Sequence, residues 1–380
     1  MHGLEGVLAR IEREREATLA RLADYLRIPS ISADPAYGDE VARCARGDRQ
    51  QGAALRTRRG RLPLNVKLLL EGEEESSGQA IETFVRGDGA ARLACDAVLI
   101  SDSSMQGRKR PAILRGFRGI VALELRVGGP GRDLHSGEYG GAVANPCNAL
   151  ARILADLHDA RSGRILVPGV YDEVRPLDEG TRRELAAVPF DEAAWAAEAG
   201  VLETSGEEGF STLERLWTRP SCDVHGVWGG YQGRGGKTVL PAEAGAKLSL
   251  RLVPDQDPRR IETLVREHVA RVTPPGVQVE IETLGTGSPV LVDLDGPVAE
   301  AAMEAIEATW GRRPVELRGG GSLPIVATFL EVLRAPVLMI GLGLPDDRLH
   351  SPNEKLDLEC LFGGIELGAR LLDRLGRLER

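Results

Sequence analysis

The sequence predicts an α/β fold in which a parallel-sheet domain is interrupted by an α+β domain of ferredoxin-like topology. Two nearly continuous apolar runs, residues 64–70 and 97–100, end in acidic residues, as buried parallel strands do where the chain leaves the sheet. Between residues 119 and 284, segments of strand and helix periodicity follow the order βαββαβ, which is typical of a ferredoxin-like sandwich. A length of 380 residues suits two domains better than one core.

The first domain begins with a helix and is expected to resume after the inserted one. Apolar residues recur at helical spacing from Leu4 to Leu26, which predicts one long amphipathic helix that ends before Pro29. The elements predicted next are a strand over 64–70, a helix over 79–86 and a strand over 96–102. After the insertion we expect a helix over 297–310, a strand over 315–317, a helix over 323–333, a strand over 336–341 and a helix that ends by Leu378. This domain therefore comprises residues 1–117 and 286–380.

The inserted domain covers residues 118–285. Its expected elements are a strand over 119–127, a helix over 145–159, strands over 223–229 and 245–253, a helix over 257–272 and a strand over 277–284. Residues 163–220 form a long insertion with mixed helix and loop signals. The alternation predicts an antiparallel sheet with two helices packed on it.

Composition and charge exclude several classes of protein. The formal net charge of −9 argues against a nucleic-acid-binding surface. No apolar run approaches the ~20 residues that span a bilayer, and the first residues lack the pattern of a signal peptide. Five cysteines are scattered without a Cys-x-x-Cys pair, which favours a reducing compartment. We therefore expect a cytoplasmic protein without nucleic-acid or membrane partners.

Acidic residues and a histidine follow the predicted strands of the first domain. Four carboxylates lie within residues 71–75, and they repel one another unless a cation is bound. Glu74 and Glu75 follow one strand, Asp102 follows the next, and His350 lies in a later loop. At one edge of a parallel sheet, such oxygen and nitrogen donors suit zinc. Taken singly, these residues have simpler interpretations, namely a helix cap, a strand-end cap and a surface histidine.

Three other features are compatible with an anionic ligand. Arg251 lies in an otherwise apolar strand, where a guanidinium needs a carboxylate from the substrate or the protein. His135 lies in a glycine-bracketed loop and either contacts a ligand or is an ordinary turn histidine. The run Gly319-Gly320-Gly321-Ser322 precedes a helix and offers backbone N–H groups to an anion, although a glycine run alone is a weak signal.

The motifs that combine these residues resemble those of one enzyme family. In chain order they are Glu71-Gly72-Glu73-Glu74-Glu75, Ser101-Asp102, Arg118-Gly119, Asp133-Leu134-His135-Ser136-Gly137, Asn145-Pro146, Lys237-Thr238-Val239-Leu240-Pro241, Ser249-Leu250-Arg251-Leu252-Val253-Pro254, Gly320-Gly321-Ser322-Leu323-Pro324 and His350-Ser351-Pro352-Asn353-Glu354. They are similar to the motifs of zinc metallopeptidases that include carnosine dipeptidase, aminoacylase and bacterial glutamate carboxypeptidase. The carnosine-dipeptidase branch is the most similar, loosely over residues 4–43 and closely over 62–378.

The resemblance implies roles for the candidate residues. Glu74 would be the general base that takes a proton from the attacking water, and Glu75, Asp102 and His350 would be metal ligands. The family holds two zinc ions, with manganese or cobalt as alternatives, and two metals ~3.5–4 Å apart polarise the scissile carbonyl. His135 would stabilise the oxyanion in the neighbouring subunit's site.

The resemblance also implies how a substrate is held. Arg251 would bind the terminal carboxylate of a small peptide, and Thr238, Asn145 and Ser322 would line the same pocket. The inserted domain would serve as a lid and as the contact of a homodimer.

The sequence departs from the family pattern near residues 44–61. The family's early His-x-Asp motif and its Asp-Asp-Lys-Gly motif are both absent, and an internal deletion in this segment would leave the catalytic sheet incomplete. One metal position would keep Glu75 and His350 and the other only Asp102, although Asp48 is a possible substitute ligand. Sites usually offer three or four protein ligands, so zinc occupancy is expected to be low.

The sequence is compatible with three hypotheses about function. The first is a metallodipeptidase that hydrolyses dipeptides or related aminoacyl amides. The second is a catalytically inactive relative that dimerises and binds through the inserted domain. The third is a peptidase chain made unstable by the deletion.

Overall fold

The computed structural model describes residues 4–29, 36, 38–40, 43, 64–72, 79–319, 323–349 and 351–378. The chain divides into two compact units. The first unit comprises Met1–Arg115, Val292–Leu317 and Ile325–Arg380, and the second comprises Gly116–Leu291 and Arg318–Pro324. The first is therefore assembled from three stretches of sequence.

A mixed sheet is built around the strand β11 (Val337–Ile340). The strand order is β1-β11-β2-β10, where β1 is Val98–Ile100, β2 is Ala112–Phe117 and β10 is Val315–Gly319; β9 (Val290–Leu291) also pairs with β2. β1 and β11 are parallel, whereas β2 runs antiparallel to β11. All four residues of β11 are buried, which means that both faces of the sheet are covered at this strand.

The helices of the first unit follow the predicted pattern closely. They are α1 (Leu4–Arg13), α2 (Arg15–Leu26), α4 (Gln79–Arg86), α5 (Gly89–Leu93), α12 (Pro297–Trp310), α13 (Pro324–Leu333, which begins at the last residue of the second unit) and α14 (Leu358–Leu375), with the short 3₁₀ turn η2 (Pro345–Asp347). The long N-terminal helix expected from the sequence is divided at Glu14. Hydrogen bonds from Glu14 N to Arg10 O and from Thr18 N to Glu14 O continue across the division.

The strand expected over residues 64–70 is not formed. Residues 64–72 have no strand conformation, and Val66 and Leu68 are 44% and 61% exposed. Apolar periodicity favours a strand only where a neighbouring strand supplies hydrogen-bond partners. No described strand pairs with this segment, and residues 44–61, where the resemblance implies a deletion, lie outside the described residues.

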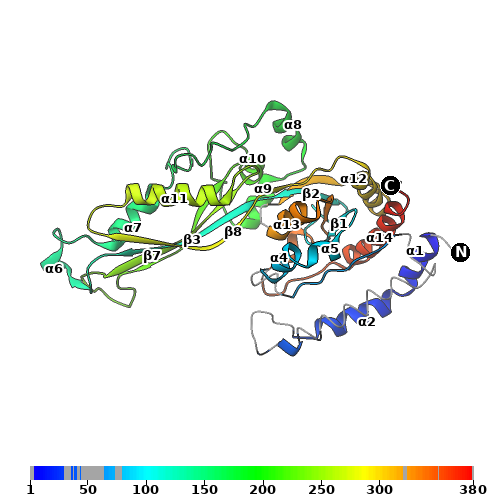
Figure 1. Ribbon diagram of the computed structural model, residues 1–380, viewed down its shortest axis with the longest axis horizontal. Coiled ribbons are helices and arrows are strands. Elements are labelled where there is room, and N and C mark those ends of the chain that lie inside the picture. Colours follow the sequence, from blue (N-terminus) through cyan, green and yellow to red (C-terminus); the bar gives the residue numbers. More distant parts are fainter. Residues whose placement is uncertain are drawn as a thin grey trace. The chain divides into compact units, whose positions relative to one another are not determined.

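The second unit has the predicted βαββαβ order. Its sheet has the strand order β5-β7-β3-β8, where β3 is Gly119–Gly128, β5 is Ser221–Gly229, β7 is Glu243–Leu252 and β8 is Gln278–Gly287. All three pairings are antiparallel. The helices α7 (Pro146–Ala155) and α11 (Pro258–Val272) pack on one face (Figure 1) and form one apolar core with β3 and β7. This is the ferredoxin-like arrangement that the sequence predicts.

Local sequence determines where these two helices begin. The side chain of Asn145 accepts a hydrogen bond from Cys147 N at the start of α7, and Asp257 does the same for Arg259 N at the start of α11. Each helix has proline at its first position, where a missing N–H group is tolerated.

Shorter elements complete the second unit. They are β4 (Leu134–His135), α6 (Ser136–Tyr139), α8 (Glu179–Ala187), α9 (Glu192–Ala199), α10 (Thr212–Thr218) and β6 (Val239–Leu240), which pairs with β4. Among the described residues, the helices are too short or too polar to cross a bilayer.

Candidate active site

Asp102 lies two residues beyond β1, beside the segment that follows β11. Leu342 N and Gly343 N donate to Ser103 O at 2.9 and 3.2 Å, and Met105 N donates to Gly343 O at 2.8 Å. A Cβ atom on Gly341 would lie 2.2 Å from the Ser103 carbonyl carbon, so only glycine allows this approach. Asp102 is exposed, which leaves its carboxylate accessible to a ligand.

The loop after β11 is tied together on both sides of position 350. Asp347 is buried and accepts hydrogen bonds from Leu344 N and from Lys355 Nζ, both at 2.6 Å. Lys355 Nζ also donates to Asp346 at 3.0 Å, and Lys355 N donates to Asp347 O at 3.1 Å. The hydrogen bonds to Asp347 and Asp346 raise the pKa of Lys355. The base of the loop is therefore closed by an ion pair and a backbone bond.

Four predicted site residues, Glu74, Glu75, Ser322 and His350, lie outside the described residues. Asp102 is the described member of the expected metal site. Two carboxylates and an imidazole are donors that suit zinc. Within the described ranges, no group of three His, Cys, Asp or Glu side chains has the spacing of a metal site.

His135 and Thr238 come together in the second unit. His135 pairs with Val239 across β4 and β6, and Ser136 N donates to Thr238 O at 3.0 Å. The exposed imidazole accepts a hydrogen bond through Nδ1 from Gly137 N at 3.0 Å. In the neutral ring the proton then lies on Nε2. His135 therefore presents a free donor to a ligand.

Asn145 already has a structural role in this unit. Its side-chain oxygen caps α7 by accepting from Cys147 N at 2.9 Å, so the amide NH₂ group and one lone pair of the oxygen remain for a ligand. A Cβ atom on Gly129 would lie 2.6 Å from the Pro146 ring. Because Gly129 follows β3 directly, the start of α7 lies at the same end of the sheet as Gly128 and its partner Glu243.

Arg251 lies at the opposite end of the sheet. It is the second-last residue of β7 and pairs with Ile120 and Ser221, whereas β6, next to His135, precedes the first residue of β7. At ~3.4 Å per residue, the eight steps from Glu243 to Arg251 span about 27 Å. In Figure 1, α6 lies beyond one end of β3 and β7 and α10 lies towards the other. A single chain therefore keeps His135 and Thr238 far from Arg251.

Pro324 approaches the sheet at the Arg251 end. A Cβ atom on Gly287 would lie 3.1 Å from the Pro324 ring and 3.4 Å from the Ile120 side chain, and Ile120 is the partner of Arg251. Pro324, which follows the glycine run, therefore lies near Ile120, the β3 partner of Arg251.

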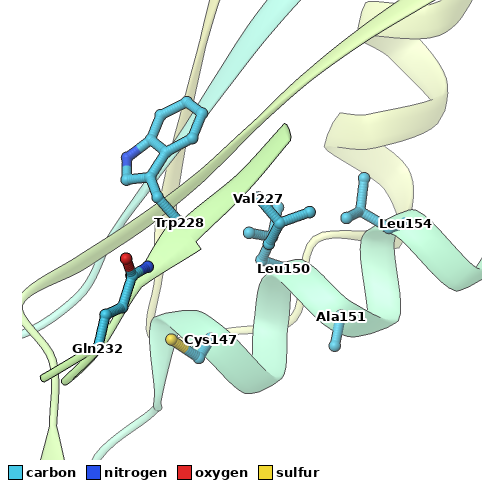
Figure 2. Close-up of a pocket in the computed structure, with 8 residues that line it drawn as sticks. Cys147, Leu150, Ala151, Leu154, Val227, Trp228 and Gln232 are labelled. Carbon is cyan, nitrogen blue, oxygen red and sulfur yellow. The ribbon is translucent and has the colours of Figure 1, made fainter. Parts of the chain in front are cut away.

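The edge strand β5 and helix α7 enclose an apolar pocket of about 250 Å³ (Figure 2). Its lining comprises Cys147, Leu150, Ala151, Leu154, Val227, Trp228, Gly229 and Gln232. Val227 is 59% exposed, and β5 pairs with β7 alone among the described strands. Unpaired backbone groups at such an edge favour the addition of another strand.

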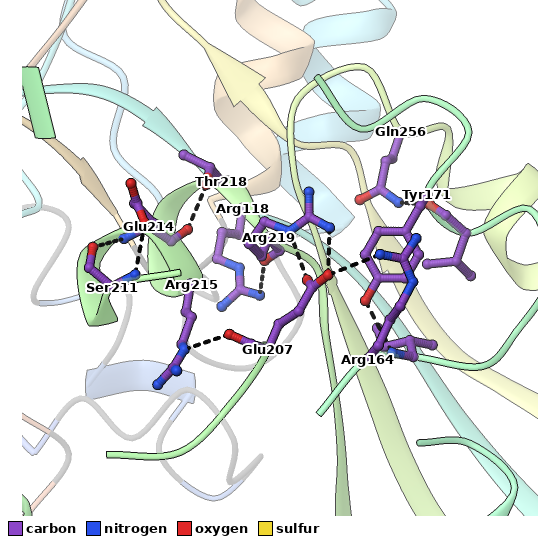
Figure 3. A network of polar contacts seen from close by, with 12 residues as sticks. Arg118, Arg164, Tyr171, Glu207, Ser211, Glu214, Arg215, Thr218, Arg219 and Gln256 are labelled. Atoms are coloured by element: carbon purple, nitrogen blue, oxygen red, sulfur yellow. Dashed lines mark hydrogen bonds and ion pairs between the residues drawn. The ribbon is translucent and has the colours of Figure 1, made fainter. Parts of the chain in front are cut away.

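A buried ion-pair network that the sequence analysis missed joins distant parts of the 163–220 insertion to one another (Figure 3). Arg219 donates to both carboxylate oxygens of Glu207, at 2.7 and 2.8 Å, and Arg164 donates to the same carboxylate at 3.3 Å. The Arg219 guanidinium also lies over the rings of Tyr171 and Phe210. Periodicity cannot reveal such a network, because its members are far apart in the sequence and are joined only by the fold.

Arg118, at the start of β3, joins this network to the Arg251 end of the sheet. Its Nη2 donates to Arg219 O at 3.1 Å and to Ser221 Oγ at 3.0 Å, and its Nε is buried without a hydrogen-bond partner. Burial, and secondly the positive charge of Arg251, lower the pKa of Arg118 to about 10. In the sequence, Arg118 is marked only by the motif Arg118-Gly119, in which the glycine begins β3.

Comparison with known families gives a match to peptidase family M20/M25/M40 over residues 51–374. The Cys-Gly metallodipeptidase DUG1 of Candida albicans is 33% identical over 310 residues, which are 80% of this chain and 64% of that protein. The Beta-Ala-His dipeptidase of Homo sapiens is 33% identical over 322 residues, 83% of this chain and 63% of that protein. The chain therefore spans less than two thirds of the length of these relatives.

Solved structures of peptidases are also similar to this chain. The dipeptidase Dug1p of Saccharomyces cerevisiae superposes with a TM-score of 0.83 at 25% identity, with all of both chains covered. Human carnosine dipeptidase 1 gives a TM-score of 0.72 at 32% identity, with 83% of this chain and 67% of that chain covered. A metallo-carboxypeptidase of Sulfolobus solfataricus gives 0.77 at 30% identity, with coverages of 89% and 76%.

Proposed function

Because the chain belongs to peptidase family M20/M25/M40, we propose that it hydrolyses the amide bond of dipeptides or related aminoacyl amides in a metal-dependent reaction. The observation that carries this proposal is the family match over residues 51–374, together with relatives named as metallodipeptidases. The expected substrate is a small peptide with a free carboxylate.

In this proposal Glu75, Asp102 and His350 hold divalent metal, with zinc preferred over manganese or cobalt. Support comes from the parallel pairing of β1 and β11, because the segments after parallel strands emerge at the same sheet edge. A bound divalent ion supplies polarisation of the scissile carbonyl and acidification of water. The discontinuous unit formed by residues 1–117 and 286–380 is the proposed catalytic domain.

Side chains carry out the proton transfer, stabilise the oxyanion and bind the substrate. Glu74 takes a proton from the attacking water and returns it to the leaving amine. His135 donates its Nε2 proton as a hydrogen bond to the oxygen that becomes negative in the transition state. Arg251 forms an ion pair with the terminal carboxylate of the peptide, and Ser322 lines the same pocket. Thr238 and Asn145, which lie at the His135 end of the sheet, complete this pocket together with His135 from a second chain.

We further propose that the active form is a homodimer joined through residues 118–285. A dipeptide spans roughly 7 Å at ~3.5 Å per residue, so it cannot reach both His135 and Arg251 of one chain across the sheet's length. A second chain must therefore supply one of them. The exposed edge of β5 and the apolar pocket beside α7 suit a second copy of the same surface.

A cytoplasmic location is proposed on the acidic net charge and the scattered cysteines. The deciding experiment measures metal per chain by elemental analysis after dialysis, and turnover of a small dipeptide panel with added zinc or manganese. Bound metal, and turnover that is lost in Glu74→Ala, are the expected results. A folded dimer with neither metal nor turnover would contradict the proposal and identify a catalytically inactive relative.

The dimer is tested separately by sedimentation velocity. Val227→Pro removes a backbone N–H group from the edge strand β5 and should shift the protein towards the monomer. Leu284→Pro, on the other edge strand β8, is the matched control. Equal effects of the two substitutions would exclude β5 as the contact.

A further inference from the structure

The Arg251 end of the sheet brings two arginines close together. Arg118 immediately precedes β3 and bonds to Ser221 Oγ at 3.0 Å, and Ser221 is the β5 partner of Arg251. The charge of Arg251 contributes to the lowered pKa of Arg118. Two guanidinium groups therefore share one small region of the second unit.

Arg118 is the more deeply placed of the two. Only 7% of the residue is exposed, its Nη2 bonds to two neutral oxygens, Arg219 O and Ser221 Oγ, and its buried Nε lacks an acceptor. The charge of Asp223 raises the pKa of Arg118, and the two side chains are linked through Ser221 Oγ, which donates to Asp223 at 3.2 Å. Among the residues that the structure describes, no carboxylate is bonded directly to Arg118.

Other charged side chains of the same unit contact a partner of opposite charge. Arg219, whose carbonyl accepts from Arg118, makes two hydrogen bonds to Glu207. In the middle of the sheet, Glu124 contacts Arg126 and Lys247 at 2.8 and 3.4 Å. A buried cation without such an acceptor is unfavourable unless an anion arrives. A carboxylate is the group that a guanidinium binds best.

We propose that Arg118 and Arg251 form a two-guanidinium site for the terminal carboxylate of a small peptide, in which Arg118 is the positioning residue that holds and reinforces Arg251. The ligand's identity rests on the proposed peptidase function. Arg118 fixes the site to the sheet through Ser221 and adds a second positive charge beside the anion. The consequence is selectivity, since peptides with a free carboxylate bind better than peptide amides.

The test compares alanylalanine with alanylalanine amide by isothermal titration calorimetry on the full-length protein, with Glu74→Ala present in every sample so that the proposed reaction does not consume the peptides. The measured quantity is the ratio of the two dissociation constants, amide over acid. Arg118→Met should lower this ratio by about tenfold, and Arg118→Lys, which keeps the charge but not the fork of donors, should lower it by a smaller factor. Arg126→Met removes an equal charge further along β3 and should leave the ratio unchanged.

A ratio that stays at the wild-type value in Arg118→Met would overturn the proposal, because a purely structural arginine affects both peptides equally. Urea denaturation shows whether each variant is folded. If Arg118→Met does not fold, an unchanged ratio in Arg118→Lys has the same meaning.

Binding is measured without turnover, so the two proposals can fail independently. A wild-type protein that prefers the free carboxylate through Arg118 but hydrolyses neither peptide would support the two-guanidinium site and refute the peptidase function. A wild-type protein that hydrolyses peptides with no preference for the carboxylate would support the peptidase function and refute the two-guanidinium site.

Discussion

If His135 acts on the substrate held by another chain, two inactive variants should restore activity when they are mixed. The perturbations are Glu74→Ala, which removes the proposed base, and His135→Ala, which removes the proposed oxyanion donor. Removal of one such donor typically lowers kcat by about 10²–10³, so we expect His135→Ala alone to retain no more than about 1% of wild-type turnover.

The size of the recovery follows from the geometry. His135 lies beyond the Glu243 end of β7 and Arg251 lies near the other end. Glu243 and Arg251 are about 27 Å apart at ~3.4 Å per residue, so each site is composed from two chains. After equal mixing and subunit exchange, about half of the dimers are mixed and each mixed dimer has one intact site of two, which gives roughly 25% of wild-type turnover. Dipeptide hydrolysis is assayed against time after mixing.

Subunit exchange must be verified independently, for example by native mass spectrometry of chains of different mass. If mixed dimers form and turnover stays at the level of the separate variants, His135 does not act across chains. That result would refute the inference drawn from the length of β7. A recovery near 25% that disappears on dilution to monomer would support it.

Three further predictions concern stability and metal binding. Glu207→Gln leaves the Arg219 charge buried without its partner and should lower the free energy of unfolding by about 3 kcal/mol in urea denaturation. The hydrogen bond and charge of Arg126 lower the pKa of Glu124, so its contribution to stability is complete above the unfolded pKa of about 4.3 and is lost as pH falls through the lower folded value. The free energy of unfolding should therefore decline in acid, and less steeply in Glu124→Gln. Lys355→Met opens the loop closed on Asp347 and should weaken zinc binding about tenfold, measured by competition with a chromophoric chelator.

Two of these predictions have a matched control variant, and the third compares wild type with Glu124→Gln. Glu184→Gln, at an exposed position of α8, should change the free energy of unfolding by less than about 0.5 kcal/mol; an equally small effect of Glu207→Gln would mean that the buried pair does not fasten the insertion. Lys109→Met is the control for Lys355→Met, and equal zinc affinities of the two variants would exclude a role for the loop base. Parallel acid profiles for wild type and Glu124→Gln would contradict the assignment of the pKa shift.

Elements with strong periodicity were predicted well from the sequence. The helix over 79–86 and the helix over 297–310 have the predicted bounds, and each element of the βαββαβ unit lies within a few residues of its expected position. Periodicity succeeds because the side-chain pattern of a strand or helix depends on which face is buried. The family, too, followed from the order of short motifs.

The prediction of a strand over residues 64–70 was wrong, because local pattern does not supply a neighbouring strand. Its apolar composition satisfies the pattern, but Val66 and Leu68 remain exposed, because a strand needs a neighbour that the local sequence does not specify. Conversely, β2 was not predicted although it joins β11 to the rest of the sheet. Strand pairing is a property of distant segments.

The sequence by itself determined the types of residue available for chemistry, the order of the elements and the family. Only the tertiary structure decided their spacing: it separates His135 from Arg251 by the length of β7 and sets Arg118 beside Arg251. It also buries Glu207 against Arg219. The physical reason is that distances between residues far apart in the chain are set by strand register and core packing. Neither is encoded in any single stretch of sequence.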